Sequence, residues 1–121
     1  MARIIFVEDT PQLLAVYQRI MRETEHDCQF FTNAMKAYDA DMTSRLPCDL
    51  LVTDYHMGGG EPYNWNGVEL IQCMKERRGK NFPCIMIASA EPPVKNPADL
   101  FLFKPFNKAD LFAAIDTLLA S

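Results

Sequence analysis

The chain has 121 residues, 49% of them hydrophobic, and a net charge of -4 at pH 7. This length and apolar content fit one globular domain spanning residues 1–121. The acidic balance argues against nonspecific nucleic-acid binding, because phosphate backbones attract clusters of Lys and Arg. No apolar run approaches the roughly 18 residues of a membrane span, and the N-terminus lacks a signal-peptide pattern.

The four cysteines show neither Cys-x-x-Cys spacing nor the spacing of a metal finger. They are Cys28, Cys48, Cys73 and Cys84. Reduced thiols of this kind are typical of cytosolic proteins, so we expect a cytoplasmic location.

Short β-branched and aromatic runs alternate with stretches of helical period, which predicts βα units and a parallel sheet. The first strand is expected over 3–7, and Thr10 is placed to cap a helix that begins at Pro11. A second strand is predicted over 28–31, followed by a helix capped by Asn33. The apolar side of that helix is predicted to consist of Ala34, Met35, Tyr38 and Met42.

The third strand, around 50–52, is apolar without alternation, as expected of a central parallel strand covered on both faces. The stretch 55–66 contains three consecutive glycines and a proline, which predicts a loop. A helix follows and is expected to stop near Gly79, where the basic run 76–80 fits a solvated helix end.

The fourth strand, 84–88, leads into a segment that contains Pro92, Pro93 and Pro97. Proline removes a backbone donor and fixes φ, so a long helix is not expected there. The fifth strand is predicted over 100–103, and Asn107 is expected to cap the last helix. Its core stripe is predicted to be Leu111, Ile115, Leu118 and Leu119.

Five polar side chains follow the predicted strands. Glu8 and Asp9 follow the first strand, Asp54 the third, Ser89 the fourth and Lys104 the fifth. In a parallel sheet the C-terminal strand ends open into one crevice, so these residues are expected to meet. Carboxylates gathered in this way repel one another unless a cation or a proton joins them. A hard divalent ion held by these acids, with a lysine and a hydroxyl opposite, suits a phosphoryl group.

This arrangement resembles the receiver domain of two-component response regulators over essentially the whole chain. Residues 6–9 resemble the acidic pair that ends the family's first strand, and 49–54 resemble the strand that leads to its phosphorylated aspartate. Residues 103–106 are close to its lysine-proline turn, and Ser89 matches its hydroxyl position. The resemblance implies an α/β, flavodoxin-like fold, with a doubly wound five-stranded parallel sheet in the order 2-1-3-4-5.

The resemblance also implies a role for each site residue. Asp54 would be the nucleophile that takes a phosphoryl group from the phosphohistidine of a histidine kinase or phosphotransfer protein. Asp9 and Asp54 would bind Mg²⁺ directly, Glu8 would act mainly through metal-bound water, and the main-chain carbonyl of His56 would complete the protein ligands. Lys104 would pair with Asp54 and later with a phosphoryl oxygen.

A switch is implied as well. Ser89 would donate its hydroxyl to the phosphoryl group, and Phe101 occupies the place of an aromatic that changes rotamer in response. Phosphorylation would thereby shift the population between two packings, and an output partner would distinguish them. The sequence does not identify this partner. The chain would assist its own phosphorylation and dephosphorylation without being a turnover enzyme, and it would bind neither nucleic acid nor a membrane directly.

Two features depart from the family pattern. The loop after Asp54 runs twelve residues before Gly67, which is longer than usual, and it contains Tyr63 and Trp65. These aromatics either form a docking patch or lid, or fold back on the domain. Only fourteen residues separate Ser89 from Lys104, which predicts that the family's fourth helix is missing or much shortened.

Two other functions stay open. A pseudo-receiver would keep the fold as an interaction module without phosphorylation, although the complete acidic pocket and the lysine argue against it. A metal-dependent hydrolase with an aspartyl nucleophile typically carries a second acid two residues after the nucleophile, where this chain has His56. The sequence also leaves open whether the domain stands alone or belongs to a hybrid kinase.

Overall fold

The structure is a computed structural model that describes residues 2–45, 47–56, 65–90 and 96–120. The strands are β1 (Arg3–Val7), β2 (Asp27–Phe31), β3 (Leu50–Asp54), β4 (Cys84–Ala88) and β5 (Leu100–Phe103). The helices of the described ranges are α1 (Pro11–Met21), α2 (Ala34–Thr43), α3 (Gly67–Arg78) and α4 (Lys108–Leu119).

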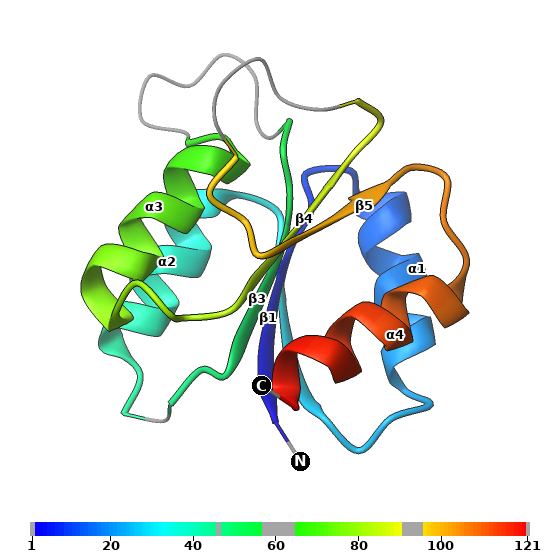
Figure 1. The fold of residues 1–121 in the computed structure, drawn as a ribbon, viewed down its shortest axis with the longest axis horizontal. Helices are drawn as coiled ribbons and strands as arrows, with labels where there is room; N and C mark the ends of the chain where they lie inside the picture. Colours follow the sequence, from blue (N-terminus) through cyan, green and yellow to red (C-terminus); the bar gives the residue numbers. More distant parts are fainter. Residues whose placement is uncertain (1, 46, 57–64, 91–95, 121) are drawn as a thin grey trace.

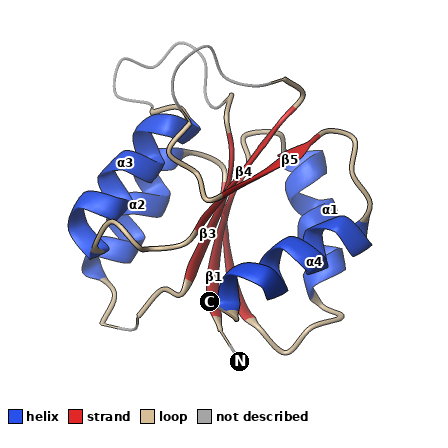
Figure 2. Cartoon of the chain, in the orientation of Figure 1, coloured by secondary structure: helices blue, strands red, loops and turns tan. Residues whose placement is uncertain are grey.

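All five strands form one parallel sheet in the order β2-β1-β3-β4-β5. Helices α2 and α3 cover one face, and α1 and α4 cover the other (Figure 1, Figure 2). The predicted doubly wound fold and its strand order are therefore confirmed.

The central strands are buried on both faces because side chains of a strand alternate between the two sides of the sheet. In β1, Ile4 and Phe6 pack into the core under α1 and α4. Ile5 and Val7 pack into the core under α2 and α3. The run of apolar residues in β3 has the same explanation, which confirms its predicted central position.

Asparagine side chains begin three of the helices. Asn33 accepts a hydrogen bond from the backbone of α2, as predicted. Asn66 and Asn107 each form a capping box at the start of α3 and α4. Thr10 precedes α1 as expected, but its side chain makes no capping hydrogen bond, and Pro11 occupies the first helical position instead.

Helix α2 does not bury the side that its apolar residues predict. Ala34 is buried, but Met42 is 52% exposed, and Met35 and Tyr38 are only partly buried. Asp41 is buried in their place, with 2% of its surface exposed. The prediction was wrong because it ranked side chains by hydrophobicity alone, and an acid with a suitable partner can be buried too.

The partners of Asp41 come from the basic run that was expected to be a solvated helix end. Arg78 donates two hydrogen bonds to the Asp41 carboxylate, with Nε 2.9 Å from Oδ2 and Nη2 2.6 Å from Oδ1. Arg77 forms a second ion pair with the same carboxylate. The end of α3 is thus tied to α2, and the expectation of a merely solvated end was wrong.

The connection between β4 and β5 contains no helix in its described residues, which are 89, 90 and 96–99. Residues 91–95 lie outside the described ranges. At its end, Asp99 Oδ2 accepts hydrogen bonds from Lys75 Nζ (2.9 Å) and from the backbone of Cys84 (2.8 Å). This contact holds the start of β5 against the start of β4.

The four cysteines are free thiols, as predicted. Burial raises the pKa of Cys84 to about 12, so this thiol stays protonated. Within the described residues, no helix combines the length and the apolar character needed to cross a bilayer.

Candidate functional site

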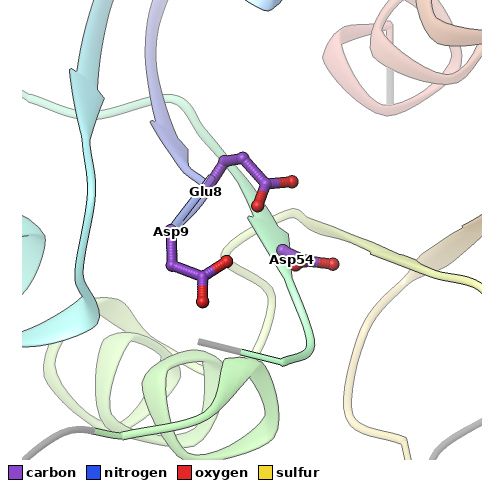
Figure 3. A group of neighbouring side chains, drawn as sticks. All are labelled: Glu8, Asp9 and Asp54. Carbon is purple, nitrogen blue, oxygen red and sulfur yellow. The ribbon is translucent and has the colours of Figure 1, made fainter. Parts of the chain in front are cut away.

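Three carboxylates meet where β1 and β3 end. β1 and β3 are neighbours, and Val7 lies opposite Thr53. The side chains of Glu8, Asp9 and Asp54 consequently converge, with one oxygen of each within 4.8 Å of the others (Figure 3). Glu8 is fully buried, Asp54 is 5% exposed, and Asp9 is half-buried. The structure thus brings together the three acids that the sequence singled out.

Lys104 reaches this cluster from the end of β5. Its Nζ lies 3.2 Å from Oε1 of Glu8 and 3.3 Å from Oδ1 of Asp54. Its backbone N–H donates to the carbonyl of Ala88 (2.9 Å), which fixes the turn after β5 against the end of β4. The pairing with Asp54 was predicted, whereas the pairing with Glu8 was not. One ammonium group therefore serves two buried carboxylates.

The pKa values of these groups reflect first of all their burial. Burial, joined by repulsion from Asp54, raises the pKa of Glu8 to about 7, although a hydrogen bond from the Thr10 backbone and the charge of Lys104 oppose the rise. Burial also raises the pKa of Asp54 against the opposing charge of Lys104. Burial alone would lower the pKa of Lys104, but attraction to Asp54 and Glu8 raises it overall, so the lysine stays charged.

The donor set fits a hard divalent cation. Carboxylate oxygens are the ligands that Mg²⁺ prefers, and Asp9, the most accessible of the three acids, leaves the cluster open toward solvent. A cation here would relieve the repulsion among carboxylates that one lysine cannot balance. The side chain of His56 is exposed and packs edge-on against the ring of Tyr55 at 4.6 Å, so it does not join the acids. The main-chain carbonyl of His56 remains the predicted fourth ligand.

Gly67 supports the site from the start of α3, and the sequence analysis did not assign it this role. Its N–H donates to the carbonyl of Tyr55 (2.9 Å). A Cβ at this position would lie 2.4 Å from the carbonyl oxygen of Asp54. Only glycine therefore allows α3 to begin so close to Asp54. A glycine directly after a capping asparagine was the available signal.

The two predicted switch residues lie near the site without contacting it. Ser89 is exposed after β4, and among the described residues its side chain makes no hydrogen bond to Asp54 or Lys104. Phe101 is half-buried, with its ring centroid 4.6 Å from that of the exposed Phe103.

The loop after Asp54 is described only at its ends, and Tyr63 lies outside the described residues. Trp65 folds back on the domain and packs edge-on against Tyr38 of α2, with ring centroids 5.2 Å apart. For Trp65, the second of the two expected arrangements is therefore observed.

An apolar groove that the sequence analysis missed borders the site. It has a volume of about 410 Å³ and lies between α1 and the turn that follows β5. Its lining residues are Leu13, Val16, Tyr17, Ile20, Lys104, Pro105 and Phe106. The ring of Tyr17 stacks on that of Phe106, with centroids 6.1 Å apart. Lys104 lines this groove and also pairs with Glu8 and Asp54, so the groove lies next to the acidic cluster.

Comparison with known proteins gives a consistent result. Residues 4–116 match the family described as the response regulator receiver domain. The CheY-like response regulator receiver domain protein of Methanospirillum hungatei has a TM-score of 0.84 and 19% identity, covering 99% of this chain and 94% of that one. The response regulator protein TrrA of Thermotoga maritima, in complex with Mg²⁺ and BeF, has a TM-score of 0.83 and 21% identity over 98% of this chain and 100% of that one.

A third similar structure is the receiver domain of a signal transduction histidine kinase from Syntrophus aciditrophicus, with a TM-score of 0.83 and 23% identity over 99% of this chain and 91% of that one. At such identities the likeness of structure shows the fold alone. No curated protein sequence is a significant match.

Proposed function

Because the chain belongs to the response regulator receiver domain family, we propose that it accepts a phosphoryl group on Asp54 in a Mg²⁺-dependent reaction. The observation that carries the proposal is the convergence of Glu8, Asp9, Asp54 and Lys104 at one edge of the sheet. Among the described residues, two buried carboxylates share a single ammonium group there, so the pocket favours a further cation and, through it, an anionic phosphoryl group. A structural neighbour in complex with Mg²⁺ and BeF gives indirect support.

The chain's own residues supply the remaining chemistry. Asp9 and Asp54 would hold Mg²⁺ together with the carbonyl of His56, and Glu8 would act through water; the ion, when bound, offsets negative charge on the phosphoryl oxygens. A carboxylate oxygen of Asp54 attacks phosphorus, a P–O bond forms, and the P–N bond of the donor phosphohistidine breaks. The imidazole leaves and takes up a proton from solvent. Lys104, already paired with Asp54, then pairs with a phosphoryl oxygen.

The donor is a histidine kinase or phosphotransfer protein in the cytoplasm, and it would approach over the groove beside Lys104. This groove is apolar and shares Lys104 with the acidic cluster, so a donor that covers it would bring its phosphohistidine close to the site. After transfer, Ser89 moves inward to the phosphoryl group, and Phe101 repacks for an output partner. Asp54 is consumed and restored in this cycle, so the domain is a switch rather than a turnover enzyme.

A small phosphodonor tests the proposal without the natural kinase. Incubation with acetyl phosphate or phosphoramidate and Mg²⁺ should add one phosphoryl group that is labile to base and hydroxylamine. Asp54→Asn and metal chelation should each abolish the addition, whereas Asp116→Asn, at an exposed position of α4, should not. An intact mass that stays unmodified, together with failure to bind beryllofluoride, would establish the pseudo-receiver alternative. Catalytic release of phosphate without a stable adduct would favour the hydrolase.

A further inference from the structure

Trp65 belongs to a set of contacts that the proposed function does not use. It lies directly before Asn66, which caps α3, and its ring meets that of Tyr38 edge-on at 72°. On α3, the guanidinium of Arg77 lies 5.4 Å from the centroid of the same Tyr38 ring. We call these three residues, Trp65, Tyr38 and Arg77, the aromatic anchor.

The aromatic anchor has a rigid base. Arg77 is paired with Asp41, whose carboxylate is also held by the bidentate contact of Arg78. Because Asp41 is buried, movement of Arg77 would leave part of a buried charge uncompensated. Tyr38 is thus held in place by α2, on which it lies, and by the last turn of α3.

The aromatic anchor also lies close in sequence to the acidic site. Gly67 follows Trp65 by two residues, and its N–H donates to the carbonyl of Tyr55. A Cβ on Gly67 would overlap the carbonyl of Asp54, so the start of α3 and the backbone after Asp54 are in direct contact. Trp65 therefore lies two residues from the hydrogen bond that ties α3 to the backbone after Asp54, and the predicted carbonyl ligand His56 follows Tyr55 in the chain.

We propose that Trp65 is a positioning residue, which uses its contact with Tyr38 to fix the backbone of residues 54–56 for metal binding and phosphoryl transfer. This inference rests on the proposed function. The aromatic anchor then does more than pack, because Trp65 holds the chain in place just before α3, at the point where α3 contacts the backbone of Asp54. Supporting residues around metal ligands commonly act in this indirect way.

Amide hydrogen exchange tests the physical part of the proposal whether or not the chain binds a metal. In Trp65→Ala the amide of Gly67 should exchange faster, by up to about tenfold, which is the factor expected from the loss of one aromatic pair. Amides in β1 and β3 should keep their wild-type rates. Trp65→Phe keeps a ring against Tyr38 and should restore protection. Met42→Ala, at the exposed side of α2, is the matched control and should leave Gly67 unchanged.

Calorimetric titration with Mg²⁺ tests the functional part. Trp65→Ala should weaken Mg²⁺ binding roughly tenfold, at the low end of the range for supporting residues, and Trp65→Phe should bind like wild type. Faster exchange at Gly67 with unchanged Mg²⁺ affinity would reduce Trp65 to a packing residue and overturn the proposal, as would unchanged exchange. If wild type itself binds no Mg²⁺, the proposed function fails, and exchange at Gly67 alone decides whether Trp65 holds the backbone.

Discussion

Two groups of buried carboxylates in this domain differ in their balance of charge. On the α2–α3 side, Asp41 is surrounded by two arginines, and Arg78 matches its carboxylate with two hydrogen bonds. At the strand ends, Glu8 and Asp54 are buried to a similar degree, and among the described residues they share one lysine, with Asp9 close by. Counted over the described residues, Asp41 therefore has more cationic partners than negative charges, whereas Glu8 and Asp54 have fewer.

The difference separates a structural cluster from a candidate site. A buried acid whose charge is already compensated gains nothing from a further cation. The ion pairs of Asp41 therefore have a structural role, which is to tie α2 to α3. A buried acid with too few cations is stabilised by a proton or a metal ion, and the pKa of Glu8 and of Asp54 is raised, mainly by burial, despite the charge of Lys104. Burial together with incomplete charge compensation thus marks the candidate site.

Removing the charge of Asp41 should have the largest effect on stability. Asp41→Asn would remove the counter-charge of two arginines from a buried position on α2, so we expect a loss of about 3 kcal/mol in the free energy of unfolding. Urea denaturation without Mg²⁺ measures it. Asp39→Asn, at an exposed position of the same helix, should stay within about 0.5 kcal/mol of wild type. A loss as small as that of the control would show that the ion pairs contribute no net stability.

The pH dependence of stability should report the deficit at the other group. The pKa of Glu8 is raised to about 7 from its ordinary 4.5, so between these pH values the folded protein holds a proton that the unfolded chain releases. Stability without metal should therefore fall as pH rises through this window, by at most about 1.4 kcal/mol per pH unit, and level off above it. Denaturation of wild type and Glu8→Gln across pH 4.5 to 8 isolates the contribution.

The variant should lack this part of the decline, and saturating Mg²⁺ should reduce it in wild type, because the ion favours the ionised carboxylates. Parallel curves for the two proteins would show that Glu8 has an ordinary environment in the fold.

Neutralising the proposed nucleophile should stabilise the metal-free domain. Asp54→Asn removes one of two buried charges that share Lys104, so we expect a gain of about 1 kcal/mol without Mg²⁺. Added Mg²⁺ should then stabilise wild type more than the variant, by ligand linkage. Thermal melts with and without Mg²⁺ make the comparison, with Asp116→Asn as an exposed control. Four identical curves for wild type and Asp54→Asn would mean that these acids do not share a site.

The smallest effect is expected beside Asp41. Met42 is 52% exposed because Asp41 occupies the buried side of α2, so Met42→Ser should change the free energy of unfolding by less than about 0.5 kcal/mol. Urea denaturation measures this as well. A loss of 2 kcal/mol or more would mean that the methionine, as its apolar character predicts, belongs to the core.

Much of the site could be predicted from sequence because it follows from strand order. Glu8, Asp9, Asp54 and Lys104 stand at or just after the end of a strand, and a parallel sheet brings its C-terminal strand ends to one edge. The strand boundaries were also clear, since short apolar runs are bounded by polar or turn residues.

The features that the sequence analysis missed depend on contacts between residues that are distant in sequence. Asp41 and Arg78 are 37 residues apart, and neither local sequence alone predicts their contact. Helical periodicity therefore assigned Met42 to the core and left Arg78 in solvent. Lys104 was matched with Asp54, but its contact with Glu8 depends on side-chain reach, which strand order does not determine. The apolar groove was missed for a similar reason, because its lining residues come from α1 and from the turn after β5, which are far apart in sequence.

Calorimetric titration with Mg²⁺ most directly tests the central claim, which is that Glu8 and Asp54 share one lysine among the described residues and therefore favour a further cation. Wild type should bind one Mg²⁺ per chain, the double variant Asp9→Asn/Asp54→Asn should bind none, and Asp41→Asn, if folded at the temperature used, should bind like wild type. Absence of binding to wild type, or equal binding to wild type and the double variant, would contradict the account.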